Sequence, residues 1–200
     1  MSAPIDFYFD FSSPYGYFAS EVIDAMAARY GRSVLWHPIL LGASFKITGQ
    51  QPLPSIPMKG DYAMRDIERS ARFIKVPYKH PHPFPIATQH AARAFLWAND
   101  RDTAQARAFA HAIYRDYFVE GGNISDLERV LELAGRNGFD THELREAITS
   151  SVIKDRLRAE VDLAISRGVF GSPFFIVEGE PFWGVDRFPQ LEKWLADGPY

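Results

Sequence analysis

The sequence predicts an α/β protein in which a small mixed sheet is interrupted by a large helical insertion. Strand-forming aromatic and β-branched residues at 5–11 lead directly into a helix start. Near the other end, the segments 171–177 and 181–184 read as two short strands joined by a tight glycine turn, with a helix after them. The periodicity between about 40 and 155 is helical.

The first helix is predicted to begin at Ser13. Pro14 suits the first helical turn, since its missing N–H would have no partner within the helix, and the serine before it can cap unpaired amides. Apolar periodicity then continues until Gly31 ends the helix, and residues 33–39 form the second strand. We therefore place Ser13 at or beside a helix start.

The C-terminal region completes the order strand, helix, strand, hairpin and helix, which is that of a thioredoxin-type fold. In the last helix, Asp186 stands three residues before Pro189, and apolar residues keep helical spacing to the end. We expect a thioredoxin-like domain made of residues 1–39 and 156–200. Residues 40–155 then form the helical insertion domain.

Within the insertion, glycines and prolines between Leu41 and Pro57 break the periodicity and predict a long loop. The pattern predicts helices after this loop. They are expected at 62–74, at 88–97, from a cap at Thr103, from a capping box at Ser125 to Gly135, around His142, and from Lys154 to Gly168.

Composition excludes several classes of protein. With 200 residues, of which 46% are hydrophobic, the chain can bury a sizeable core. A formal net charge of −3 gives no reason to expect a nucleic-acid or acidic-membrane partner. The first residues lack the features of a secretory signal, and no apolar run is long enough to cross a bilayer. We expect a cytoplasmic enzyme.

The chain contains no cysteine, although the usual chemistry of a thioredoxin-type fold depends on a cysteine at a helix start. Structural disulfides and cysteine-ligated metals are excluded for the same reason. His80 and His82 offer no third ligand of matching spacing, so we predict no metal site. If the fold is right, the reactive sulfur must come from outside the protein.

Motifs in a fixed order along the whole chain carry a family resemblance. They are Phe9-Asp10-Phe11-Ser12-Ser13-Pro14-Tyr15, Leu40-Leu41-Gly42, Pro57-Met58-Lys59-Gly60-Asp61-Tyr62, Phe84-Pro85, Gly171-Ser172-Pro173 and Phe182-Trp183-Gly184-Val185-Asp186-Arg187. In these the chain resembles the 2-hydroxychromene-2-carboxylate isomerases and the related kappa-class glutathione transferases. The resemblance implies a DsbA-like thioredoxin fold, a glutathione cofactor and a homodimer.

By this resemblance, Ser13 is the catalytic residue, and its hydroxyl would hydrogen-bond the sulfur of glutathione. A helix start favours a thiolate, and a hydroxyl donor stabilises it further. Without the resemblance, a helix cap is the simpler role for Ser13, and we expect its neighbour Ser12 to be structural. Pro173 resembles the cis-proline of thioredoxin-like folds, which would leave the main chain of Ser172 free to pair with glutathione.

Two charged residues complete the expected glutathione site. Asp186 matches the position that receives the γ-glutamyl ammonium, although it could equally cap the last helix. Lys59 matches a basic residue that contacts a carboxylate of glutathione or substrate, and its alternative is a solvated surface charge. Gln50 and Ala87 stand where relatives often carry asparagine, so the substrate side of the site differs from the family pattern.

The resemblance implies a glutathione-dependent isomerase. Its reaction would interconvert 2-hydroxychromene-2-carboxylate and trans-o-hydroxybenzylidenepyruvate in aromatic degradation, with a small aromatic carboxylate as substrate. Two alternatives stay open. One is a kappa-like transferase that conjugates glutathione to small electrophiles, and the other is a non-catalytic module that binds glutathione or a peptide.

Overall fold

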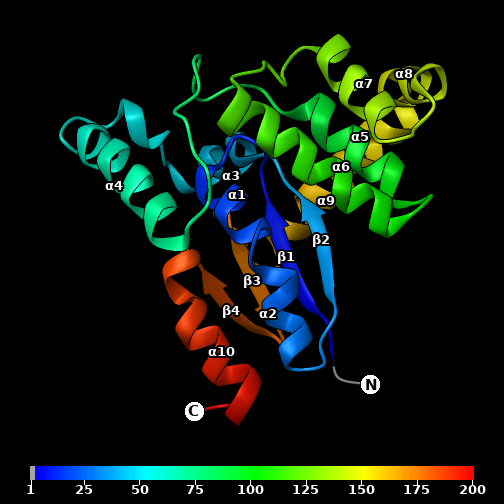
Figure 1. Cartoon of the computed structure of the whole chain (residues 1–200). Coiled ribbons are helices and arrows are strands. Elements are labelled where there is room, and N and C mark those ends of the chain that lie inside the picture. Colours follow the sequence, from blue (N-terminus) through cyan, green and yellow to red (C-terminus); the bar gives the residue numbers. More distant parts are fainter. Residues whose placement is uncertain (1–2) are drawn as a thin grey trace.

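A four-stranded mixed sheet forms the centre of residues 3–200, the part of the chain that the computed structural model describes (Figure 1). The strands lie in the order β2-β1-β3-β4. β1 and β2 are parallel, whereas β3 is antiparallel to both β1 and β4. Their bounds are Ile5–Phe9 (β1), Val34–Pro38 (β2), Phe174–Val177 (β3) and Glu180–Trp183 (β4).

The turn between β3 and β4 has the conformation that its sequence predicts. Glu178 and Gly179 have φ angles of 54° and 90°. Two consecutive residues of positive φ are typical of a tight two-residue hairpin, because this backbone twist matches that of the flanking strands. The predicted hairpin is confirmed.

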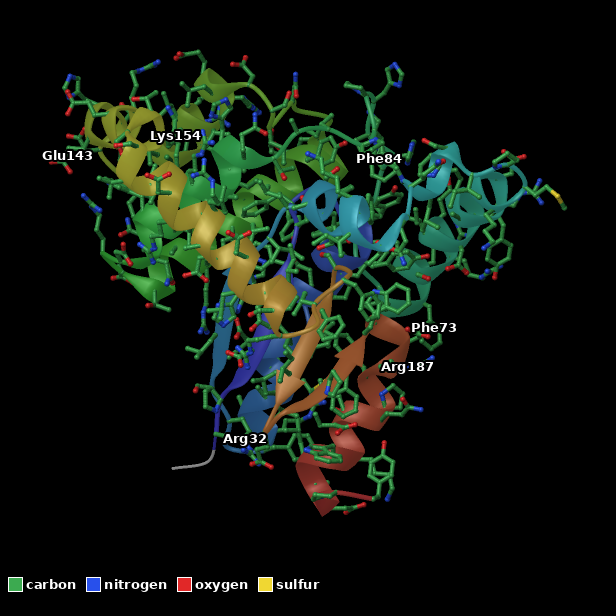
Figure 2. The ribbon with its side chains drawn as sticks, turned by 180° about the vertical axis from the view of Figure 1, so that it is seen from behind. Arg32, Phe73, Phe84, Glu143, Lys154 and Arg187 are labelled. Atoms are coloured by element: carbon green, nitrogen blue, oxygen red, sulfur yellow. The ribbon has the colours of Figure 1, made fainter. Side chains whose placement is uncertain are left out.

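Alternate residues of the strands face opposite sides of the sheet, and each side is covered by helices. Phe7 and Phe175 stack at a centroid distance of 5.4 Å within the larger core, while Tyr8 and Phe174 belong to a smaller cluster on the other side. In Figure 1 the helices α1, α2 and α10 lie in front of the sheet and α9 lies behind it, as the reverse view in Figure 2 also shows. These helices are α1 (Pro14–Ser20), α2 (Ile23–Arg29), α9 (Ser151–Ser166) and α10 (Phe188–Asp197).

The helical insertion lies between β2 and α9. Helices α5 to α8 pack against one another as one group, and α4 packs on α1 and on the short helix η1. Figure 1 shows α5 to α8 gathered at one end of the sheet, with α3 and α4 on the side of α1. The elements are α3 (Leu41–Thr48), η1 (Leu53–Ser55), α4 (Lys59–Ile74), α5 (Gln89–Asn99), α6 (Thr103–Arg115), η2 (Asp116–Glu120), α7 (Leu127–Arg136) and α8 (Thr141–Thr149).

The long loop predicted after Leu41 is wrong, because α3 and η1 occupy much of it. Gly42 lies inside α3, and Gly49 ends this helix at a φ of 70°. A glycine of positive φ just past a helix is a common terminator, so Gly49 marks a helix end rather than a loop. The single helix predicted after Ser13 is likewise divided in two, with the break at Glu21 and Val22.

Two predicted helix caps are displaced by one residue. The side chain of Asp102, not Thr103, accepts the hydrogen bond that caps α6. The cap of α7 is Asp126, whereas Ser125 donates its hydroxyl proton to Asn123. In both places the structure uses the carboxylate beside the predicted hydroxyl, and a carboxylate is at least as good a cap.

The division into residues 1–39 plus 156–200 and 40–155 stays a prediction. Helix α9 runs without interruption across residues 155 and 156. Among the described residues, no helix is both long and apolar enough to cross a membrane.

Candidate active site

Ser13 caps the first helix of the chain and joins it to the end of β1. Its backbone is extended, with φ of −93° and ψ of 115°, and its hydroxyl oxygen accepts the Gly16 amide at 3.0 Å. Pro14 follows in the first turn of α1. The predicted helix start at Ser13 is confirmed, and the side chain is at the positive end of the helix dipole.

The hydroxyl of Ser13 also donates a hydrogen bond to the main-chain oxygen of Ser172, at 2.8 Å. The Ser172–Pro173 peptide bond is cis. A second contact strengthens this junction, because the amide of Asp10 donates to the hydroxyl of Ser172 at 2.9 Å. Ser13 therefore meets two predicted site residues from the other end of the sequence, Ser172 and Pro173, beside the N-terminus of α1.

The close approach of α1 to the Ser172 loop requires a glycine at position 16. A Cβ atom there would lie 2.8 Å from the Ser172 hydroxyl oxygen and 3.0 Å from the Tyr114 hydroxyl oxygen. Contacts under about 3 Å are too short for a side-chain carbon. Gly16 is not among the residues predicted from the sequence, although it lies within the first helical turn after Ser13.

The main chain of Ser172 can accept a further partner. The residue is half-buried, and across residues 3–200 its amide donates to no acceptor. An unpaired amide next to a carbonyl group offers the two main-chain groups through which an extended peptide can be bound by strand pairing. The chain thus offers one donor and one acceptor beside the hydroxyl of Ser13.

Asp10 is the site residue that sequence reasoning missed. It is 5% exposed, and its carboxylate accepts the Ser12 amide, the Leu41 amide and the Thr88 hydroxyl at 2.8 to 2.9 Å. Burial raises the pKa of Asp10, against the lowering effect of these three hydrogen bonds. A lone acidic residue within Phe9-Asp10-Phe11 was the signal that could have indicated it.

Ser12 has the structural role that we predicted for it. Its hydroxyl oxygen accepts the Ile86 amide at 3.2 Å, which ties the segment before α5 to the start of α1. The buried hydroxyl of Tyr114 donates to the main-chain oxygen of Asp10 at 3.2 Å. The turn between β1 and α1 is thus held by insertion residues on both sides.

Asp186 lies in η3 (Val185–Arg187), a short helix that contacts α1. Its carboxylate is exposed and lies 3.1 Å from the guanidinium of Arg187. The alternative role of capping the last helix is wrong, since the cap position of α10 is Arg187 and carries no side-chain cap. An exposed carboxylate near α1 is instead accessible to a cationic ligand group.

Lys59 is the first residue of α4, and its side chain is exposed. The turn before it is unusual, because Met58 has a φ of 66° and the Lys59 amide bonds back to the Pro57 oxygen at 2.8 Å. Among residues 3–200, no carboxylate forms an ion pair with Lys59. The lysine is therefore available to an external anion, on a helix that packs against α1.

The family model of the DSBA-like thioredoxin domain matches residues 4–196. A 2-hydroxychromene-2-carboxylate isomerase of Sphingobium xenophagum is 32% identical over 203 residues, which cover 98% of this chain and 100% of that protein. The chain belongs to this isomerase family, within the DsbA-like thioredoxin fold. The predicted fold and the predicted family are confirmed.

Two further comparisons place this family member among its relatives. A solved structure of a 2-hydroxychromene-2-carboxylate isomerase has a TM-score of 0.86 at 26% identity, and the match covers 96% of this chain and 94% of that one. Glutathione s-transferase kappa 2 of Caenorhabditis elegans is 27% identical, over 96% of this chain and 92% of that protein. The likeness to both groups extends over the whole chain, as the ordered motifs predict.

In this family member two hollows lie away from Ser13. One, of about 350 Å³, is lined by residues of β4 and α10, and the other, of about 160 Å³, lies beside β2. Neither is lined by any of the predicted site residues, which are Ser13, Lys59, Ser172, Pro173 and Asp186. Ser13 itself is buried, with 4% of its surface exposed.

Proposed function

We propose that this protein is a glutathione-dependent isomerase that interconverts 2-hydroxychromene-2-carboxylate and trans-o-hydroxybenzylidenepyruvate. The observation that carries the proposal is the hydroxyl of Ser13, which caps α1 and lies 2.8 Å from the main-chain oxygen of Ser172. A relative that this chain matches over its whole length bears the isomerase name, and a kappa-class relative is named a glutathione transferase. Together these support an isomerase that uses glutathione.

The chemistry of the donors and acceptors around Ser13 fits a tripeptide thiol. The Ser172 amide and carbonyl suit the main chain of its cysteine, and the exposed Asp186 carboxylate suits its ammonium. The Lys59 ammonium suits a carboxylate of glutathione or of the substrate. Since the chain has no cysteine, these groups complement a ligand that brings its own sulfur.

When such a ligand binds, the hydroxyl of Ser13 would donate its hydrogen bond to the ligand instead of to the protein. The hydroxyl has one proton, which it donates to the Ser172 oxygen in the protein alone. Donating that proton to a thiolate instead would free the Ser172 oxygen to accept an amide of the tripeptide. The Gly16 amide would continue to hold the Ser13 oxygen, so the total number of hydrogen bonds need not fall.

Glutathione, held by the Ser172 main chain, Asp186 and Lys59, would supply a thiolate nucleophile for the conjugated carbon once the ring C–O bond of the hemiketal has opened to a phenol and a ketone. Addition would allow rotation about the carbon–carbon bond, and loss of the thiolate would restore the double bond. Ser13 and the N-terminus of α1 would stabilise that negative charge. Lys59 would hold a carboxylate and so orient the reacting carbon. Glutathione would be regenerated in each cycle.

The kappa-class relative favours one alternative function, conjugation of glutathione to small electrophiles. The same thiolate would then remain attached to the product, so that one thiol is lost in each turnover. A spectrophotometric assay separates the two functions. Isomerisation predicts a change in the chromene absorbance with catalytic glutathione and constant free thiol, whereas conjugation predicts loss of free thiol with an aryl halide.

The decisive experiment compares the wild-type protein with Ser13→Ala. We expect chromene turnover that depends on glutathione in the wild type, and a loss of roughly 100-fold in the variant, which is typical when one donor to a reacting anion is removed. Turnover without glutathione would overturn the proposal. Glutathione binding without any turnover would favour the non-catalytic module.

A further inference from the structure

A side-chain hydrogen bond links the helix that Ser13 caps to the helix that Lys59 begins. Tyr15, in the first turn of α1, donates its hydroxyl to Asp66 of α4 at 2.5 Å. The tyrosine ring packs edge-on against Phe18, with centroids 5.8 Å apart. The two helices that carry predicted site residues are therefore joined directly.

The donor and acceptor of this bond have fixed protonation states near neutral pH. The hydrogen bond from Tyr15 lowers the pKa of Asp66, and Arg69 lowers it further. Burial raises the pKa of Tyr15, and the Asp66 carboxylate raises it further. The phenol thus keeps its proton and the carboxylate its charge, which makes the hydrogen bond about twice as strong as a neutral one.

Besides this bond, α4 packs on α1 and on η1, and Ile74 near its end packs against the larger core. All of the buried residues of α4 except Ile67 are small, and the buried set is Gly60, Ala63, Ile67 and Ala71. Large side chains on its other faces, such as Tyr62 and Phe73, are exposed. Because small residues bury little apolar area, we expect the polar contact with α1 to contribute to the orientation of α4.

We infer that the Tyr15–Asp66 hydrogen bond is a positioning contact that sets Lys59 at the distance from Ser13 that an anionic ligand requires. The inference rests on the proposed function. Lys59 lies seven residues before Asp66, or roughly 10 Å along the helix axis. A tilt of α4 by about 10° at Asp66 would therefore move Lys59 by roughly 2 Å, enough to weaken a contact with a carboxylate.

The test is a double-mutant cycle with Tyr15→Phe and Lys59→Met. The dissociation constant of reduced glutathione is measured by calorimetry, and the KM of the chromene substrate is measured by absorbance. Lys59→Met should raise one of these two constants, and we expect Tyr15→Phe to raise the same one by about 5- to 20-fold. The kcat of Tyr15→Phe should stay within about twofold of the wild type. In the double variant, the loss should not exceed that of Lys59→Met alone.

Tyr62→Phe is the matched control. It removes a hydroxyl from the same network, 3.5 Å from Asp66, but from an exposed ring on α4 itself. Hydrogen exchange of the ligand-free proteins gives a readout independent of activity. Amides of α4 should exchange faster in Tyr15→Phe than in the wild type, and Tyr62→Phe should leave their exchange unchanged.

Additive losses in the double variant, or equal effects of Tyr15→Phe and Tyr62→Phe, would overturn the inference. It also fails if Lys59→Met changes neither constant. In each of these cases the proposed function still stands if the wild type binds glutathione and turns over the chromene. A wild type that binds no glutathione refutes the proposed function, and the inference with it.

Discussion

At the scale of single residues, the geometry of the candidate site depends on Ser13, Gly16 and Asp10. Each has its place because of a close contact across the junction between β1, α1 and the Ser172 loop. Ser13 carries the proposed chemistry, Gly16 allows the approach, and Asp10 holds the surrounding segments together. Replacing each one tests a different part of the account.

Gly16→Ala tests the approach of α1 to Ser172. The added methyl group would lie 2.8 Å from the Ser172 hydroxyl oxygen, so the Ser172 side chain or the loop before Pro173 must shift. We expect the unfolding free energy to fall by about 1–3 kcal/mol and glutathione affinity to fall with it. Chemical denaturation and calorimetry measure the two effects. Unchanged values of both would show that the loop adapts freely.

Asp10→Ala tests the buried carboxylate. Removing it leaves the Ser12 amide, the Leu41 amide and the Thr88 hydroxyl without their acceptor. Each buried group left unpaired costs about 1–3 kcal/mol, so we expect a loss of unfolding free energy of roughly 3 kcal/mol or more. Exposed Asp61→Ala on α4 is the control. A loss no greater than the control's would mean that water replaces the carboxylate.

At the scale of elements, the junction of β1, β2 and α9 contains a histidine whose pKa is shifted by its neighbours. His37 of β2 lies 2.9 Å from Asp6 of β1 and 3.8 Å from Glu160 of α9. Burial lowers the pKa of His37, but the hydrogen bonds to these two carboxylates outweigh it, and the net pKa is raised. The protonated histidine thus joins three elements that the sequence separates widely.

This raised pKa predicts the direction of a pH effect on stability. A group whose pKa is higher in the folded state stabilises the fold fully below its unfolded pKa, about 6.5 for histidine. The contribution is lost as pH rises through the folded pKa. We therefore expect the difference in unfolding free energy between the wild type and His37→Gln to shrink above about pH 6.5. His82→Gln, in an exposed loop, is the control, and a difference that grows with pH would contradict this account.

For the whole molecule, the sequence alone predicts the order of elements and the location of Ser13. Both depend on local signals: a strand-forming run, a serine before a proline, and a glycine turn between two strands. Helix α3 escaped prediction because Gly42 lies within it and Gly49 terminates it, and glycine is read as a loop signal. The role of Asp10 could not be predicted from the sequence, because two of the groups that donate to it, on Leu41 and Thr88, approach it only in the folded chain.

Assembly is a second property of the whole molecule, and it depends on family resemblance rather than on contacts in one chain. We expect a homodimer, as the resemblance to the isomerases and kappa transferases implies. Light scattering on the purified protein at micromolar concentration should give twice the mass of the chain. A monomer mass at all concentrations would contradict this prediction.

The central claim is that Ser13 stabilises the thiolate of a bound glutathione. The most direct measurement is a pH titration of the ultraviolet thiolate absorbance of glutathione bound to the wild type and to Ser13→Ala. The account predicts a bound thiol pKa below the ordinary value of about 8.5 in the wild type, and a shift back toward it in the variant. A bound thiol that titrates at the same pH in both proteins would contradict the account.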